Sequence, residues 1–295
     1  MTTYLLRIVA VLVVACIVLP AGAQVPPPAL LSCADPELQN KLDHCLLDLK
    51  LGQAVRDKSL CVALVDITDV DAPRLAAVNG DQMMYAASLP KIAILLGAFD
   101  RIDKGELTLT GDIRHKLTSM IRNSSNSSAT EMLNLVGKDY LAELLQSPRY
   151  RLYDPEMNGG LWVGKDYGRA AAWKRDPLHN LSHGATALQV ARFYYLLDTG
   201  QLVSPDMSRE MKEILGDPAI HHKFVKGIEQ VSPDAKIYRK SGTWRTYHAD
   251  SGIIEHDGHR YIAVALADNP AGSKWLSKLI VSLDNLICQT GATPR

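Results

Sequence analysis

The apolar residues of this chain follow a strand period at both ends of the sequence and a helix period between them. Short apolar runs at 60–67 and 75–79 are typical of strands, and between 88 and 215 apolar positions recur every three to four residues, as in helices. Short strands return between 236 and 267. This order predicts one sheet, built from both ends of the chain, with a helical lobe inserted between its strands.

The pattern also sets the bounds of each expected element. Helices are expected at 36–51, 88–104, 112–122, 129–136, 139–146, 185–197, 205–215 and 273–287, and strands at 60–67, 75–79, 236–240, 251–255 and 260–267. Asp257-Gly258 separates the last two strands and predicts a tight antiparallel hairpin. The sheet lobe is then expected at about 30–85 and 216–295, and the helical lobe at about 86–215.

Residues 1–23 have the pattern of a secretory signal peptide. Arg7 precedes an apolar stretch at 8–19, and small residues fill 21–23 before the expected cleavage after Ala23. The apolar stretch is too short for a comfortable membrane span, so no stable membrane anchor is expected. This predicts a periplasmic or secreted protein. A lipoprotein with Cys16 at its processing site is the alternative, but apolar residues continue past that cysteine.

Charge is balanced along the chain. The 295 residues include 32 basic and 32 acidic side chains, and removal of Arg7 with the signal peptide leaves a net charge of −1. This balance leaves no excess of positive charge of the kind that nucleic-acid binding needs. The length after cleavage suits one large domain or two lobes, and we expect a monomer.

Two pairs of histidines do not predict a metal site. His256 and His259 flank the turn expected at 257–258, where a solvated turn is the simpler interpretation. His221-His222 follow Pro218, which prevents one continuous helix from presenting them together with the acidic residue before it. We therefore expect no metal and no cofactor.

Four cysteines remain after signal-peptide cleavage, namely Cys33, Cys45, Cys61 and Cys288. An even number in an exported chain favours disulfides, although four cysteines allow three pairings. Buried free thiols are the alternative.

Ser88-Leu89-Pro90-Lys91 is the only Ser-x-x-Lys in the chain. Proline suits the first turn of a helix, and the apolar run at 92–99 indicates that this helix is buried. Ser88 and Lys91 then share one helix face. A lysine in apolar surroundings has a lowered pKa, so its neutral amine can take the serine proton.

A second motif, Ser124-Ser125-Asn126, precedes the helix expected at 129–136. A serine hydroxyl can relay a proton, and an asparagine amide can hold a substrate amide through its donor and its acceptor. Serine and asparagine before a helix are also common N-caps, so this motif by itself leaves capping and catalysis open.

A third motif, Lys240-Ser241-Gly242-Thr243, stands at the end of the strand expected at 236–240. Lysine and a serine hydroxyl suit a carboxylate, while Gly242 lets a ligand approach the backbone closely. The NH of Thr243 can face a developing oxyanion. A solvated strand end is the alternative.

In this order the three motifs resemble the active-site signature of class A β-lactamases and penicillin-binding proteins, which is Ser-x-x-Lys, Ser-x-Asn and Lys-Thr/Ser-Gly. The resemblance extends along most of the chain after residue 23. It implies one α/β (α+β) domain at 24–295 with the β-lactamase/DD-peptidase-like fold. That fold has a five-stranded antiparallel sheet, flanked by terminal helices, and an inserted all-helical lobe.

The resemblance implies acyl transfer through a serine ester. Ser88 is then the nucleophile, Lys91 its base and Ser124 the proton relay to the leaving nitrogen. The oxyanion lies between the NH groups of Ser88 and Thr243. The substrate-binding residues that the resemblance implies are Asn126 for the side-chain amide, Lys240 and Ser241 for the carboxylate, and Gly242, Thr243 and Asn158.

The chain departs from the family where the acyl-enzyme is hydrolysed. Class A enzymes activate water with the glutamate of a Glu-x-x-x-Asn loop, and here Asp154 occupies that position, with Asn158 at the end of the loop. Aspartate is one methylene shorter, and a base must lie within hydrogen-bond reach of its water. Three alternatives follow. A shift of the loop brings Asp154 within reach of the water, Glu156 acts as the base instead, or the loop carboxylate has no catalytic role.

Other departures concern the walls of the cleft. The segment between Lys91 and Ser124 is shorter than in typical class A enzymes, which opens one wall. The insertion-like stretch at 159–183 either rebuilds that wall or narrows access. Ser251 stands where many class A enzymes have a carboxylate-binding arginine, and Arg245 is either its replacement or an exposed turn residue.

The resemblance also implies that the first and last helices pack side by side. This arrangement predicts a disulfide between Cys33 and Cys288. A second pair, Cys45 with Cys61, is expected between the first helix and the first strand.

The sequence therefore predicts an exported class A-like β-lactamase, which opens β-lactam rings through an acyl-enzyme on Ser88. The second hypothesis is a penicillin-binding DD-peptidase or esterase that β-lactams acylate and that deacylates slowly. The third is a non-catalytic β-lactam-binding domain, which the complete set of motifs disfavours. In the first two cases the partner is a small-molecule β-lactam or a peptidoglycan-like peptide.

Overall fold

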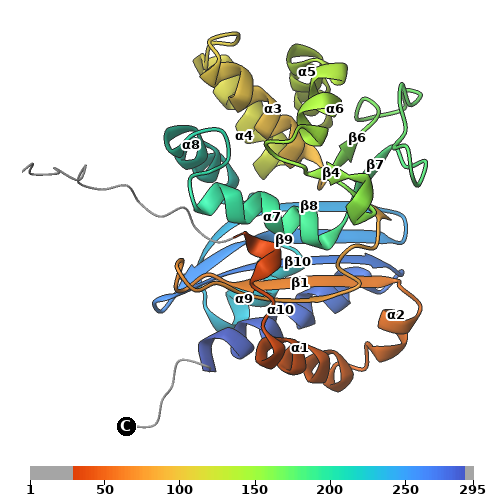
Figure 1. Ribbon diagram of the computed structural model, residues 1–295, viewed down its shortest axis with the longest axis vertical. Coiled ribbons are helices and arrows are strands. Elements are labelled where there is room, and N and C mark those ends of the chain that lie inside the picture. The colour runs from red at the N-terminus through yellow and green to blue at the C-terminus, as the bar shows by residue number, and fades with distance from the viewer. Residues whose placement is uncertain (1–28, 290–295) are drawn as a thin grey trace, which may run out of the picture.

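The computed structural model describes residues 29–289 (Figure 1). The signal peptide predicted at 1–23 lies outside these residues. The helices are η1 (Leu30–Ser32), α1 (Pro36–Asp48), α2 (Gly52–Arg56), α3 (Lys91–Asp103), α4 (Gly111–Arg122), α5 (Asn126–Val136), α6 (Lys138–Gln146), η2 (Pro155–Met157), α7 (Ala187–Asp198), α8 (Pro205–Leu215), α9 (Phe224–Val231) and α10 (Gly272–Gln289). The strands are β1 (Leu60–Asp66), β2 (Arg74–Val78), β3 (Met84–Tyr85), β4 (Tyr153–Asp154), β5 (Gly159–Gly160), β6 (Trp162–Val163), β7 (His183–Ala185), β8 (Lys236–Trp244), β9 (Tyr247–His256) and β10 (His259–Asp268).

A five-stranded antiparallel sheet forms the centre of the fold, in the order β2-β1-β10-β9-β8. Strands β1 and β2 precede the central helices in the sequence, and β8, β9 and β10 follow them. The α/β (α+β) prediction is therefore confirmed. Strand β8 lies at an edge of the sheet, so one side of its backbone is open to other partners.

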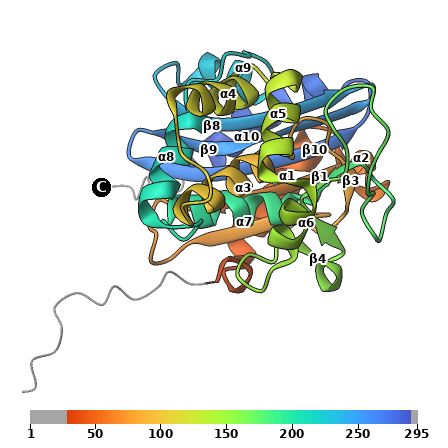
Figure 2. The ribbon, with the colours of Figure 1, turned by 90° about the horizontal axis from the view of Figure 1, so that it is seen from above.

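Helices cover both faces of this sheet (Figures 1 and 2). Helices α1 and α10 lie side by side on one face, with α9 against α10. On the other face α7 packs on β1 and β10, and α3, α4, α5 and α6 lie beyond it. None of the helices within 29–289 is both long and apolar enough to cross a membrane.

Strand β1 shows why the sheet holds these two layers together. All of its residues are buried, since helices cover both of its faces. Successive side chains point to opposite faces. Leu60 and every second residue after it therefore pack with α1 and α10, whereas Cys61 and its alternate neighbours pack on the α7 side.

Two features near the C-terminus differ from the sequence prediction. Strand β8 continues to Trp244, so the motif at 240–243 lies inside a strand rather than at its end. Helix α9 was not predicted, although its apolar residues Phe224, Val225 and Ile228 recur at helical spacing. Gly227 is needed in this helix, since an added Cβ would lie 2.5 Å from a backbone oxygen of α10.

The hairpin predicted at Asp257-Gly258 is confirmed. His256 pairs with His259 across the turn, and the two turn residues have φ values of +50° and +77°. Two successive positive φ values are those of the tight turn that Asp-Gly favours.

The predicted disulfides are wrong, since Cys33, Cys45, Cys61 and Cys288 are all free thiols. Cys45 packs on the α1 side of the sheet and Cys61 on the α7 side, so β1 itself separates them. Cys33 likewise packs on the α7 side, whereas Cys288 lies in the last turns of α10. The side-by-side terminal helices are present, but Cys33 precedes α1 and packs on the α7 side of the sheet.

These contacts predict the thiol count of the protein. A chain that begins at Gln24 should titrate with four thiols after denaturation without reductant, and the same number after reduction. Matched measurements on Cys33→Ser should give three in both conditions. A count of two or none before reduction would contradict the structure.

Candidate active site

Ser88 lies in the turn before α3 rather than on the helix itself. The turn closes through a hydrogen bond from Leu89 N to Ala86 O, and Ala87 has a φ of +50°. A positive φ is unfavourable for alanine, so the surrounding packing must hold this turn in place. Ser88 is partly exposed and its Oγ makes no hydrogen bond to a described residue. Its hydroxyl is therefore free to meet a ligand.

Lys91 opens helix α3 and is fully buried. Its Nζ donates to Ser124 O at 2.6 Å, to Asn126 Oδ1 at 2.8 Å and to Ser125 O at 3.2 Å, and it lies 3.5 Å from Ser124 Oγ. The first two motifs, which are more than thirty residues apart in the sequence, thus meet at one amine. Burial lowers the pKa of Lys91 to about 7.

Ser124 is the point where all three motifs converge. Its φ is +57°, in the left-handed region, which turns the segment between α4 and α5 toward the sheet. Lys240 Nζ of β8 donates to Ser124 Oγ at 3.0 Å and to Ser241 O at 2.7 Å. We call Lys91, Ser124, Asn126 and Lys240 the Lys91 cluster.

Lys240 carries the second buried amine of the Lys91 cluster. Burial, and then the nearby charge of Lys91, lower the pKa of Lys240 well below its usual range. Two ammonium groups beside one hydroxyl repel each other, so the cluster favours a state in which one amine is neutral.

Gly242 fixes the distance between β8 and the Ser88 turn. A Cβ at this position would lie 2.1 Å from Ala86 O and 2.9 Å from Ser88 N. Only glycine allows the strand to pass so close to another backbone. The NH of Ser88 is therefore held beside the strand segment that carries Thr243.

A third buried lysine, Lys223, is hydrogen-bonded to the same segment of β8. Its Nζ donates to Gly242 O at 2.6 Å, to Thr243 Oγ1 at 2.8 Å and to Ala249 O at 3.0 Å. Burial lowers the pKa of Lys223 to about 8, although the charge of Asp250 opposes this shift. The sequence analysis did not identify Lys223, because no motif marks it.

His222, the neighbour of Lys223, also reaches the third motif. Its Nε2 lies 3.2 Å from Ser241 Oγ. Burial lowers the pKa of His222 to about 4, and the charge of Lys223 adds to this shift. The imidazole is therefore neutral near pH 7. The histidine pair at 221–222 thus contributes a hydrogen-bonding group to this site.

Comparison with known families identifies the chain. A model described as the β-lactamase enzyme family matches residues 53–116 and 111–290. The chain belongs to the β-lactamase enzyme family. A comparison with curated proteins finds no match.

Solved structures show the same β-lactamase fold. A β-lactamase from Chitinophaga pinensis has a TM-score of 0.65 and 17% identity, with 84% of this chain and 100% of that chain covered. A β-lactamase from Sphaerobacter thermophilus has a TM-score of 0.66 and 16% identity, over 87% and 99% of the two chains. PBP-A has a TM-score of 0.62 and 18% identity, over 88% and 97%. At these identities the likeness concerns the fold.

The loop at 154–158, which the sequence resemblance implied for deacylation, makes its contacts with other groups. Asp154 is buried, and its carboxylate accepts from Arg151 Nε at 2.9 Å and from Glu156 N at 3.1 Å. Glu156 is exposed and pairs with the same arginine. Between residues 29 and 289, no hydrogen bond or ion pair links either carboxylate to Lys91.

Asn158, the last residue of this loop, is also separate from the Lys91 cluster in its contacts. Its Nδ2 donates to Asp81 O at 2.9 Å, and its Oδ1 lies 3.0 Å from His179 Nε2. Its φ of +57° ends the short helix η2. The structure therefore brings eight of the ten predicted site residues into one contact network, whereas the side chains of Asp154 and Asn158 bind other partners.

The stretch at 159–183 supplies an aromatic ring, rather than a carboxylate, beside Lys91. The ring of Tyr167 lies with its centroid 4.6 Å from Lys91 Nζ and 4.3 Å from the ring of His183. Hydrogen bonds with Thr130 Oγ1 fix both backbone groups of Tyr167 to α5. The Tyr167 hydroxyl is buried without a hydrogen-bond partner in the described part of the chain. This stretch thus narrows access to the buried amine.

Ser251 and Arg245 do not form a second cationic site on β9. Ser251 is buried, and its Oγ donates to Lys240 O at 3.0 Å. Arg245 lies in the exposed β8–β9 turn with its guanidinium 5.6 Å from the Trp244 ring centroid. Lys223 is the buried cation beside Thr243 in this family member.

Gly242→Ala tests the close approach of β8 to the Ser88 turn. The added Cβ must displace backbone atoms, so we expect the free energy of unfolding to fall by about 1–3 kcal/mol. Chemical denaturation measures this change. Gly111→Ala is the control, because its added Cβ meets no atom within 4 Å. Equal stability of Gly242→Ala and the wild type would contradict the packing.

Proposed function

We propose that the protein is an exported serine hydrolase that opens β-lactam rings through an ester on Ser88. The observation that carries this proposal is the Lys91 cluster, in which a buried amine and a second lysine share the hydroxyl of Ser124. In this proposal residues 1–23 direct export. The domain at 24–295 works as a monomer, with its site between a sheet lobe at 30–85 and 216–295 and a helical lobe at 86–215.

Acylation would begin at the Ser88 hydroxyl. Neutral Lys91 takes the Ser88 proton while Ser88 Oγ bonds to the lactam carbonyl carbon. The NH groups of Ser88 and Thr243 stabilise the oxyanion. The carbon–nitrogen bond of the ring then breaks, and Ser124 passes its proton to the leaving nitrogen while it takes one from protonated Lys91. Its contacts with both lysines support this relay role.

The substrate carboxylate would bind along β8. The hydroxyls of Ser241 and Thr243 are its hydrogen-bond donors, and Lys240 supplies positive charge. Lys223 adds a second cation through its contact with Thr243. Neutral His222 beside Ser241 would donate to the serine oxygen, and so leave the hydroxyl proton for the carboxylate. Asn126, whose Oδ1 is used by Lys91, keeps its NH₂ group for the substrate amide carbonyl.

A second candidate function is a penicillin-binding enzyme whose acyl-enzyme persists. The specific observation in its favour is that Lys91 faces the Tyr167 ring, while Asp154 is bound to Arg151. Hydrolysis of the ester needs a base within hydrogen-bond reach of a water. PBP-A, whose fold is similar, includes a variant solved as an acyl-enzyme complex with penicillin G. Asp154 or Glu156 would have to leave Arg151 to supply a fast deacylation base.

Mixing the purified protein with a chromogenic cephalosporin distinguishes these functions. We expect a mass increase on Ser88, followed by hydrolysis of the cephalosporin, and Ser88→Ala should lose both signals. Ser127→Ala, a nearby exposed serine, is the control and should retain them. A stable adduct without turnover supports the second candidate. Turnover that survives Ser88→Ala would rule out the serine ester.

The pH dependence of acylation tests the role of Lys91. With a pKa of about 7, Lys91 is mostly charged below pH 7 and cannot accept the serine proton. The acylation rate should therefore rise about 50-fold from about pH 5 to about pH 7 and level off above it. Rapid-mixing measurements of the adduct give this profile. A flat profile over that range would argue against neutral Lys91 as the base.

A further inference from the structure

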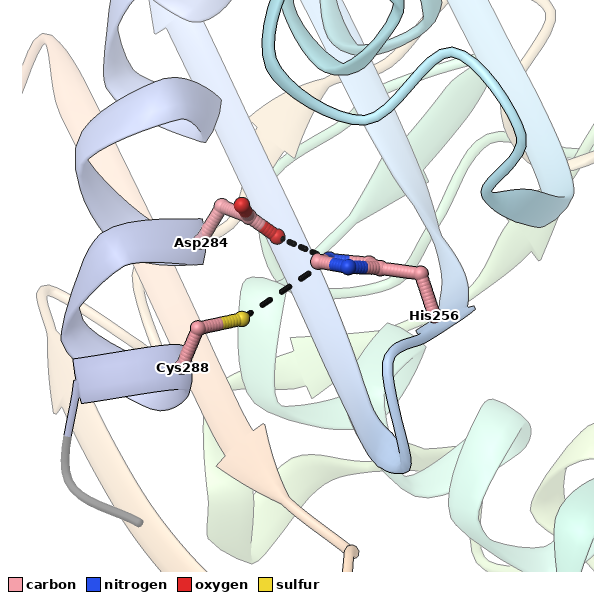
Figure 3. A group of neighbouring side chains, drawn as sticks. All are labelled: His256, Asp284 and Cys288. Carbon is pink, nitrogen blue, oxygen red and sulfur yellow. Dashed lines mark hydrogen bonds and ion pairs between the residues drawn. The ribbon is translucent and has the colours of Figure 1, made fainter. Parts of the chain in front are cut away.

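A second group of reactive side chains lies away from the Lys91 cluster, where α10 meets the end of β9 (Figure 3). His256 is the last residue of β9, and Asp284 and Cys288 are one turn apart on α10. One ligand atom from each of these residues lies within 4.8 Å of the others. We call them the His256 triad. Figure 3 shows both α10 side chains directed toward the imidazole.

The atoms of the His256 triad converge on one imidazole nitrogen. His256 Nε2 lies 2.6 Å from Asp284 Oδ1 and 3.8 Å from Cys288 Sγ. Residues at i and i+4 share a helix face, so Asp284 and Cys288 present their ligand atoms together. Asp284 is buried, and the side chain of His256 is only 7% exposed. The helix and the strand end therefore form a small enclosed donor set.

The outer contacts of this triad are those of a metal-binding histidine. The second ring nitrogen, His256 Nδ1, lies 3.1 Å from Asp257 Oδ2 and 3.3 Å from Ser232 Oγ. A metal-ligating histidine almost always uses its other nitrogen in this way, which fixes the direction of the coordinating lone pair. Tyr261 OH donates to Asp284 Oδ1 at 2.7 Å and holds that carboxylate in turn.

We propose that His256, Asp284 and Cys288 bind one Zn²⁺ ion. Zinc accepts nitrogen, oxygen and sulfur ligands together and prefers four in a tetrahedron, so water fills the fourth position. Ligand atoms in such a site are about 3.5 Å apart. The separation of Nε2 and Sγ is already close to this value. The Nε2–Oδ1 pair must widen by about 1 Å as the ion takes the place of their shared proton.

Zinc binding at this site would release two protons, which offsets the charge of the ion. Cys288 loses its thiol proton to become a thiolate, and the proton between His256 and Asp284 leaves as the metal enters. Nothing is oxidised or reduced. The bound ion would link the last turns of α10 to the β9–β10 hairpin. The site would therefore stabilise the terminal helix layer rather than take part in acyl transfer.

The sequence did not predict this site because its members are far apart. Asp284 and Cys288 follow His256 by 28 and 32 residues. His259, which flanks the same turn as His256, pairs with His256 in the hairpin and is not a member of the triad. Only the packing of α10 on the sheet completes the donor set.

Cobalt binding tests the proposal, because Co²⁺ occupies zinc sites and is visible in absorption whereas Zn²⁺ is not. We expect the reduced, purified protein to bind one Co²⁺ with a thiolate-to-metal charge-transfer band, which Zn²⁺ then removes. Cys288→Ser should lose this band and weaken Co²⁺ binding by at least about tenfold. Cys33→Ser, a cysteine of similar exposure, is the control and should keep both.

A measurement on the wild-type protein removes any dependence on how the variants fold. Zn²⁺ should protect Cys288 from alkylation and leave Cys33 reactive, as read from peptide masses. A wild-type protein without the charge-transfer band would overturn the proposal. So would a band that persists in folded Cys288→Ser, or equal alkylation of Cys288 with and without Zn²⁺. These results would leave the triad as a hydrogen-bonded contact only.

Discussion

Burial of the Lys91 side chain is the constraint on which the site depends. An amine at the start of a buried helix needs polar partners, and the segment before α5 supplies them through two carbonyl oxygens and the Asn126 amide. The left-handed backbone of Ser124 places these groups over Lys91. The same contact brings the Ser124 hydroxyl to Lys240, and so joins the helices to the edge strand of the sheet.

The second requirement is a close approach between backbones. Gly242 lets β8 pass against the Ser88 turn, while Lys223 donates to Gly242 O of β8 and to Ala249 O of β9. Three buried lysines therefore surround one short segment of β8. Burial lowers the pKa values of all three lysines, and at Lys240 the charges of Lys91 and Lys223 add to this shift.

In the proposed function, the two half-reactions differ because of where the carboxylates lie. The groups proposed for acylation meet at Ser124, whereas Asp154 is bound to Arg151. The face of Tyr167 occupies the space beside Lys91. Under the proposed function, rapid hydrolysis of the ester would require Asp154 or Glu156 to leave Arg151. The proposed zinc site lies where α10 meets His256, and within residues 29–289 its three side chains make no hydrogen bond to the Lys91 cluster.

Local signals in the sequence determined much of this protein. Apolar periodicity defined the long helices and the strands, the Asp-Gly pair defined the last hairpin, and three motifs identified the residues of the Lys91 cluster. These features are readable because each depends on residues close together in the chain.

Contacts between distant residues were decided only by the tertiary structure. Strand alternation in β1 put Cys45 and Cys61 on opposite faces of the sheet and excluded the expected disulfide. Packing likewise brought Lys223 and Tyr167 to the site, and it joined His256 to α10. The apolar periodicity of a sequence does not predict which distant side chains come into contact, because those contacts depend on how the layers of the fold pack.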